Sequence, residues 1–132
     1  MMMKFLQPEG WIAPKGYANG ISATGRQVFV SGMIGWDAHG QFHSDDFAAQ
    51  VRQALQNVVT VLQEAGAKPE HIVRMTWYVV DKAEYIAAYS EIGKAYREII
   101  GRHFPCMSAV QVAALIEDRA KVEIEVTAVV PE

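Results

Sequence analysis

The sequence contains one cysteine, no excess of basic residues and no long apolar run, and each absence excludes a class of protein. A single cysteine cannot form an internal disulfide, so a reducing compartment is expected. The net charge of −3 argues against a phosphate-binding surface, and therefore against a nucleic-acid partner. No apolar run reaches the length of a signal peptide or of a membrane span. We therefore expect a soluble, cytoplasmic protein with no membrane partner.

The hydrophobic content is sufficient for one domain. Hydrophobic residues make up 51% of the 132 residues, which is enough to build a core at this chain length. No linker, repeat or low-complexity segment divides the sequence, so we expect a single domain over residues 1–132. Residues 1–16 contain two prolines and two glycines, which predicts an irregular N-terminal arm.

The local pattern predicts two strands and then a long helix. Residues 19–32 consist of two β-favouring pieces joined at Gly25 and Arg26, which indicates a hairpin. Residues 46–65 carry apolar side chains at spacings of three and four, which is typical of an amphipathic helix. Asp45 or Asp46 can cap its N-terminus and Gly66 can end it. The predicted buried stripe consists of Phe47, Val51, Leu55, Val58 and Leu62.

The second half predicts a strand, a helix and two further strands. The segment "IVRMTWYVV" is rich in β-branched and aromatic residues. Asp81 can cap a helix that ends at Gly101, and "SAVQVAAL" and "KVEIEVTAVV" follow as strands. The order is therefore β-β-α-β-α-β-β. Two helices of this length can cover one face of a sheet, so we expect an α+β fold.

The last predicted strand alternates between apolar and acidic residues. Glu123 and Glu125 share one face, with apolar residues on the other. The polar face is either solvated or part of an interface, and periodicity does not distinguish the two. The two carboxylates lie about 6–7 Å apart along the strand. They could divide acid and base roles, or they could simply form a polar strand face.

Other candidate groups give weaker signals. Cys106 and His103 are close enough in sequence to suggest a thiolate–imidazole pair, although a buried cysteine usually acts as a small hydrophobe. His39 and His43 are four residues apart in a loop, where the spacing imposes no metal-binding geometry. We therefore expect surface histidines there, and neither a metal nor a cofactor.

Four segments together resemble the Rid family, also called the YjgF family of reactive-intermediate deaminases. They are "RQVFVSGMIGWDAHGQF", "QVRQALQNVVTVLQEAG", "IVRMTWYVVD" and "FPCMSAVQVAAL" with "VEIEVTAVV". The resemblance covers residues 16–130. It implies a chorismate-mutase-like fold and a homotrimer in which the mixed sheet faces pack around a central axis. It also implies that neighbouring subunits share clefts. In the well-studied branch, these clefts hydrolyse enamines and imines such as 2-aminoacrylate to a 2-keto acid and ammonia.

The resemblance also implies a set of site residues. Glu123 would hold and deprotonate the attacking water, and the phenol of Tyr17 would donate to the substrate. Ser31 and Gly32, which end the second predicted strand, would border the cleft with their backbone. The expected substrate-binding residues are Ser31, Gly32, Met107, Ser108, Tyr89 and Trp36.

Two positions depart from the deaminase branch. That branch has an arginine at the position of Met107 and commonly an asparagine at the position of Tyr89. A thioether cannot form the bidentate, charged pair that a guanidinium makes with a carboxylate. Losing that pair costs about 1.5–3 kcal/mol, or about ten- to a hundredfold in binding. Whether Arg52, Arg74 or Arg119 compensates is left open by the sequence.

Three functions follow from this pattern. We expect a hydrolase that converts a small enamine or imine to a carbonyl compound and ammonia, acting on a larger or less anionic substrate than 2-aminoacrylate. The first alternative is a trimeric protein that binds or senses a small metabolite without catalysis. The second alternative, a ribonuclease or translation inhibitor as described for other family members, conflicts with the acidic net charge.

Overall fold

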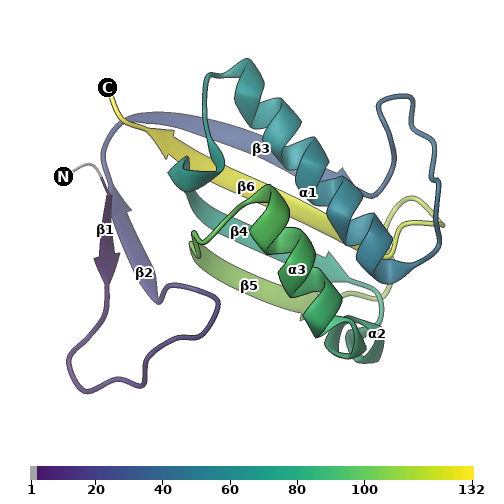
Figure 1. Cartoon of the computed structure of the whole chain (residues 1–132), viewed down its shortest axis with the longest axis horizontal. Coiled ribbons are helices and arrows are strands. Elements are labelled where there is room, and N and C mark those ends of the chain that lie inside the picture. Colours follow the sequence, from purple (N-terminus) through teal and green to yellow (C-terminus); the bar gives the residue numbers. More distant parts are fainter. Residues whose placement is uncertain (1–2) are drawn as a thin grey trace.

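A four-stranded mixed sheet, covered by helices on one face, forms the body of the molecule (Figure 1). The computed structural model describes residues 3–132. The strands and helices are β1 (Met3–Leu6), β2 (Gly20–Ala23), β3 (Arg26–Ile34), α1 (Phe47–Glu64), the 3-10 helix η1 (Pro69–His71), β4 (Ile72–Val79), α2 (Lys82–Ala87), α3 (Tyr89–Ile99), β5 (Cys106–Gln111) and β6 (Val122–Val130).

The strand order of the main sheet is β3-β6-β4-β5. β6 is antiparallel to both of its neighbours, whereas β4 and β5 are parallel. A parallel pair needs a crossover connection, which α2 and α3 provide. Figure 1 shows α1 and α3 side by side over the same face of the sheet. The prediction of an α+β fold with helices on one face is confirmed.

The helix α1 supplies much of the core. All five residues of the predicted stripe are buried, and four of them are fully inaccessible to solvent: Val51, Leu55, Val58 and Leu62. The Asp46 carboxylate accepts a hydrogen bond from the Ala49 amide at 3.0 Å, as expected of an N-cap. Gly66 has a φ of 68°, which ends the helix in the left-handed region. No helix within residues 3–132 has both the length and the apolar character that a membrane crossing requires.

The N-terminal region differs from the prediction in two ways. β2 pairs with β1 in a separate two-stranded sheet, so the predicted hairpin over residues 19–32 is wrong. The arm predicted as irregular contains β1, and residues 1–2 of that arm lie outside the described part. At Gly25 a Cβ atom would lie 2.2 Å from the carbonyl oxygen of Val130. The chain therefore passes closely over the end of β6 here, and β2 finds its backbone partners in β1 instead of β3.

The second predicted helix is divided in two. The Asp81 carboxylate caps α2 by accepting from the amides of Ala83 and Glu84. The α2 helix ends at Ala88, whose φ of −98° and ψ of 8° break the helical path before α3 begins. Tyr89 is the first residue of α3 and is 55% exposed. The break therefore places Tyr89 at the surface, at the start of α3.

Candidate active site

Gly32 and Glu123 come together on the sheet face that the helices leave uncovered, and Ser31 lines a hollow with Glu125 on the same face. Val30 pairs with Val126 and Met33 pairs with Ile124, so β3 has one residue more than β6 between these pairs. This β-bulge at Ser31 and Gly32 bends the strand locally. β3 continues beyond the bulge to Ile34, so the prediction that these two residues end the strand is wrong.

The carboxylate of Glu123 lies directly over Gly32. A Cβ atom built on Gly32 would be 2.2 Å from Oε2 of Glu123, which no real pair of atoms allows. Only glycine therefore permits the carboxylate to occupy this place. Its backbone φ is not in the left-handed region, so the close approach and not the backbone conformation requires glycine here.

The two acidic residues of β6 have different partners. The Tyr78 hydroxyl donates to Oε1 of Glu125 at 2.7 Å. This hydrogen bond is the main cause that raises the pKa of Tyr78, and burial and the charges of both glutamates add to it. Glu123 makes no side-chain hydrogen bond or ion pair with any residue of the described range 3–132. Of the two carboxylates on this face, Glu123 is the one whose oxygens are free for a substrate or water.

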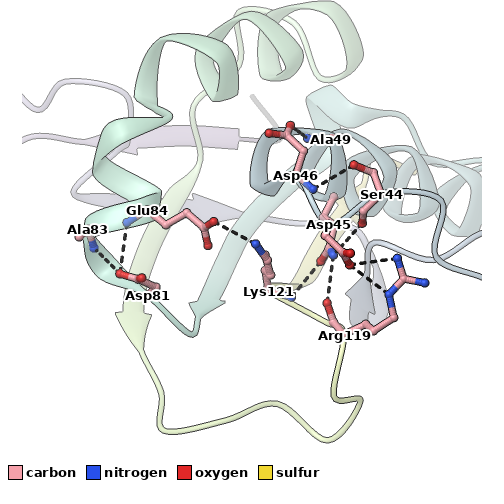
Figure 2. A network of polar contacts seen from close by, with 10 residues as sticks. Ser44, Asp45, Asp46, Ala49, Asp81, Ala83, Glu84, Arg119 and Lys121 are labelled. Carbon is pink, nitrogen blue, oxygen red and sulfur yellow. Dashed lines mark hydrogen bonds and ion pairs between the residues drawn. The ribbon is translucent and has the colours of Figure 1, made fainter.

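A polar network fixes the segment that leads into Glu123. The buried Gln50 side chain donates to the Arg119 carbonyl at 3.0 Å and accepts from the Lys121 amide at 2.9 Å. The Lys121 ammonium pairs with Glu84 at 3.0 Å (Figure 2). This network ties the start of β6 to the first turns of α1 and α2, two residues before Glu123. The position of the Glu123 backbone is therefore set by both helices.

A second group of predicted residues lies near the exposed edge of β5. The Ala18 amide donates to the Pro105 carbonyl at 3.0 Å, and this contact attaches the N-terminal arm beside β5. As a result, Tyr17, Met107 and Ser108 line one hollow, together with Arg74 and Cys106. The Tyr17 side chain is 41% exposed.

Met107 also lines a neighbouring aromatic cavity of about 240 Å³ between α3, β4 and β5. We call this space the aromatic cavity. Tyr85 and Tyr89 meet edge to face with ring centroids 5.1 Å apart. Trp77 is only 4% exposed, and its indole N–H has no hydrogen-bond partner within residues 3–132. The lining residues are Gly16, Trp77, Tyr85, Tyr89, Ile92, Gly93, Tyr96, Arg97, Phe104, Met107 and Ala109.

One chain does not bring Met107 and Glu123 together. Met107 is the parallel partner of the buried Met75 and packs toward the helices, because paired residues of neighbouring strands share a face. Glu123 lies on the opposite face, and its partner on β4 is Tyr78. The strand β4 lies between the two positions, and their partners on β4 are three residues apart.

Trp36 lies apart from both groups. It packs against Phe42 in the loop after β3, with ring centroids 5.9 Å apart. Its carbonyl accepts from the Asn57 amide group at 2.8 Å, which ties this loop to α1. Trp36 is not part of the lining of the aromatic cavity.

The alternative catalytic pair from the sequence is not formed. The His103 ring makes a 2.6 Å hydrogen bond with the Ile72 carbonyl, and its edge meets the Phe5 ring. The imidazole is thus engaged away from Cys106, and the thiolate–imidazole hypothesis is wrong for this conformation.

The loop histidines belong to a structured turn. His43 pairs with Asp37 at 2.6 Å, whereas His39 offers only its backbone amide to the same carboxylate. Hydrogen bonds from the Gln41 amide, from His43 and from the His39 amide lower the pKa of Asp37 to about 2. Within residues 3–132 no cluster of three or more potential metal-ligating side chains occurs.

The arginines that the sequence left open have distinct surroundings. Arg52 pairs with Glu98 at 2.7 Å, and Arg119 pairs with Asp45 at 3.0 Å. Arg74 lines the hollow beside Tyr17. The arginine in the aromatic cavity is instead Arg97, which sequence reasoning missed.

Comparison with known proteins identifies relatives along nearly the whole chain. Residues 11–130 match the family described as endoribonuclease L-PSP. A 2-iminobutanoate/2-iminopropanoate deaminase from Salmonella typhimurium is 34% identical, with 86% of each chain covered. A human protein of the same name is 32% identical over 79% of this chain and 73% of its own length.

The fold has close matches among solved structures. The structure of YyfB, a protein of unknown function of the conserved Rid family from Yersinia pestis, has a TM-score of 0.86 and 29% identity. The match covers 98% of this chain and all of that one. The architecture is therefore the chorismate-mutase-like α+β fold that the sequence resemblance implied.

Proposed function

Because the chain belongs to the endoribonuclease L-PSP family, which includes the Rid proteins, we propose that it hydrolyses imines or enamines to a carbonyl compound and ammonia. The observation that supports this most is the free Glu123 carboxylate over Gly32. The two deaminases named above support the reaction class, because each covers more than two thirds of this chain at over 30% identity.

The proposed mechanism uses the carboxylate as a general base. Glu123 takes a proton from a water molecule as its oxygen adds to the imine carbon, and the imine nitrogen gains a proton. In the resulting carbinolamine, the C–N bond breaks as the hydroxyl becomes the carbonyl group, and ammonia leaves. Tyr17 donates a hydrogen bond to the substrate during these steps. No cofactor is needed, because the reaction is a hydrolysis without change of oxidation state.

We place the reaction in a cleft between subunits of a homotrimer. Glu123 and Met107 lie on opposite faces of one sheet, and Tyr17 and Ser108 lie at the β5 edge with β4 between β5 and β6, so one copy of the chain offers only half of the proposed site. In this arrangement, the exposed edge of β5 in one subunit and the bulged β3 edge in the next form a complete site. Phe29 supports burial of the open face by another copy, because its side chain is 69% exposed there.

The proposed substrate is larger or less anionic than 2-aminoacrylate. Met107 provides neither a charge nor a hydrogen-bond donor where the deaminase branch has arginine. It instead contributes an apolar wall to a cavity that already contains Trp77 and Tyr89. The acidic net charge gives little support to ribonuclease activity, since the phosphate backbone demands cationic contacts.

The test is turnover of a panel of imines, generated from amino acids by an amino-acid oxidase. We expect faster release of ammonia with wild-type protein than without it. Replacing Glu123 by Gln should lower the enzymatic rate at least about a hundredfold, since general base catalysis contributes about 10²–10⁴-fold. Glu125→Gln is the matched control on the same strand face and should change the rate less than about threefold.

Two results would contradict the proposal. A wild-type protein that accelerates none of the imines would leave only metabolite binding, for which the aromatic cavity is a candidate. A fully active Glu123→Gln variant would remove the assigned role of that carboxylate while leaving the reaction class in place.

A further inference from the structure

The aromatic cavity has the size and walls of a site for a single aromatic ring. Its volume of about 240 Å³ is several times the roughly 30 Å³ that one water molecule occupies. It is smaller than most drug-sized ligand pockets, which begin at about 300 Å³. Tyr89 at its mouth is 55% exposed, so the cavity is open to solvent. Aromatic walls favour planar ligands, because rings pack edge to face or in offset stacks.

The side-chain polar groups of the residues that line this cavity are the indole of Trp77, the guanidinium of Arg97 and three tyrosine hydroxyls, which can both donate and accept. The buried indole N–H of Trp77 has no acceptor in the described part of the chain. A buried donor without a partner destabilises the folded state, because it has lost its hydrogen bonds to water. The guanidinium of Arg97 can only donate, and it has no ion-pair or hydrogen-bond partner among residues 3–132. These two donors without a partner in the described range favour a ligand that carries acceptor oxygens.

The helix α3 provides space for this guanidinium. Gly93 lies one turn before Arg97, and a Cβ atom at that position would be 3.2 Å from Nη1 of Arg97. The Arg97 side chain therefore lies back across Gly93 along the cavity wall. Glycine in the interior of a helix is less favourable than alanine, and no left-handed backbone requires it at this position. A side chain at position 93 would require the guanidinium to shift by only a small distance, so Gly93 allows this close approach but is not required by it.

We propose that the aromatic cavity binds the ring of an aromatic carboxylic acid, or of the corresponding imino acid, and that Arg97 binds its carboxylate. Arg97 then supplies from α3 the cation that Met107 does not supply from β5. The inference rests on the proposed function for the reaction, and it adds the substrate class: imines of 2-keto acids with an aromatic side chain. It assigns specificity to Trp77, Tyr89 and Arg97.

Arg52, Arg119 and Arg74 do not combine an unpaired guanidinium with a place in the lining of the aromatic cavity. Arg52 and Arg119 are already paired with carboxylates. Arg74 is the register partner of Cys106, next to the pair formed by Met75 and Met107. Because side chains alternate along a strand, Arg74 points to the face opposite the aromatic cavity. Arg74 lines the hollow of Tyr17 and Ser108, so the matched control is instead Lys94, an exposed cation on the same helix as Arg97 that does not line the aromatic cavity.

The experiment measures binding by isothermal titration calorimetry with three unreactive probes. Phenylpyruvate carries a ring and a carboxylate, 2-oxobutanoate carries only the carboxylate, and phenylacetamide carries a ring without charge. We expect wild-type protein to bind phenylpyruvate at least about tenfold more tightly than 2-oxobutanoate. Arg97→Gln should weaken phenylpyruvate binding about tenfold and change phenylacetamide binding less than twofold.

Lys94→Gln serves as the matched control and should change neither affinity more than about twofold. Lys94 and Arg97 are both exposed residues of α3, so both variants should fold, which circular dichroism and thermal melting can verify. The inference is wrong if phenylpyruvate does not bind, if 2-oxobutanoate binds as tightly, or if Arg97→Gln has no more effect than Lys94→Gln.

Turnover separates this inference from the proposed function. If phenylpyruvate binds in an Arg97-dependent way but no imine is hydrolysed, the aromatic acid site stands and the proposed reaction fails. If imines from phenylalanine and 2-aminobutyrate are hydrolysed equally well by wild type and Arg97→Gln, the reaction stands and the inference fails.

Discussion

The open face of the sheet and the face beneath the helices hold their candidate functional side chains in different ways. On the open face, Glu123 occupies a place that exists because Gly32 has no side chain, and Tyr78 engages the neighbouring Glu125. Beneath the helices, Met107 and Trp77 are held by packing among aromatic rings. The site on the open face depends on the positions of single atoms, whereas the cavity beneath the helices depends on the volume and shape of packed side chains. Substitutions on the two faces should therefore differ in the kind of effect as well as in its size.

The largest expected effect comes from changing the chemistry of the packed face. Met107→Arg should increase hydrolysis of 2-aminoacrylate about ten- to a hundredfold, because a guanidinium can pair with the carboxylate. The control is Met107→Gln, which has similar length without the charge and should give no gain. Enzyme kinetics with freshly generated 2-aminoacrylate is the measurement. Equal rates in wild type and Met107→Arg would show that the missing charge does not determine substrate choice.

On the open face, one added methyl group should be enough to disturb the site. Gly32→Ala forces the Glu123 carboxylate away from its position, since the new Cβ would lie 2.2 Å from Oε2. We expect kcat/KM to fall about tenfold, because small displacements of a catalytic group are costly. In a Glu123→Gln background the same change should have little further effect, and a double-mutant cycle tests this. Independent, additive losses would contradict a shared role.

Tyr96 tests the packed face through stability. Its hydroxyl donates to the His103 carbonyl at 2.5 Å, and its side chain is 4% exposed. Tyr96→Phe should lower the free energy of unfolding by about 1 kcal/mol, because the part-buried His103 carbonyl loses its donor. Urea denaturation at neutral pH measures this loss. No change in the denaturation midpoint would show that another donor replaces the hydroxyl.

The same residue predicts a loss of stability in alkaline solution. Burial raises the pKa of Tyr96 above its ordinary value of 10, so the folded state keeps the proton that the unfolded chain releases. The stabilisation is complete below pH 10 and is lost as the pH rises above that value. Wild type should therefore lose more stability than Tyr96→Phe between pH 9 and 11, roughly the range around an unperturbed tyrosine. Parallel curves for the two proteins would refute this.

The smallest effect is expected from the tyrosine of the open face. Tyr78 also donates a hydrogen bond, but its partner Glu125 is a partly exposed carboxylate that water can solvate. Tyr78→Phe should therefore lower the free energy of unfolding less than Tyr96→Phe does. Urea denaturation beside Tyr96→Phe gives the comparison directly. A loss as large as that of Tyr96→Phe would mean that this face is as sensitive to a lost hydrogen bond as the packed one.

Local features of the fold could be predicted from the sequence. The stripe of α1 is buried at every predicted position, and Asp46, Asp81 and Gly66 act at the helix ends as expected. Each of these features depends on residues within one or two turns of chain. The partner of β2 and the bulge at Ser31 and Gly32 could not be predicted, because they depend on strands distant in the sequence.

In the candidate site, too, some features could be predicted from local sequence and others depend on distant parts of the chain. Strand alternation placed Glu123 and Glu125 on one face, but which of them is free depends on Tyr78 from another strand. The sequence did not point to Arg97, because the residues that share the cavity with it come from β4, β5 and the N-terminal arm. Its one sequence signal was Gly93, a glycine one turn earlier in the interior of a predicted helix.

The sequence by itself determined the α+β class, the family resemblance and the absence of a cation at position 107, since each can be read from residue type and spacing. Only the tertiary structure decided that Met107 and Glu123 lie on opposite faces and that Arg97 reaches the cavity of Met107. The physical reason is that strand pairing and helix packing join residues far apart in the chain, and local propensities do not specify those partners.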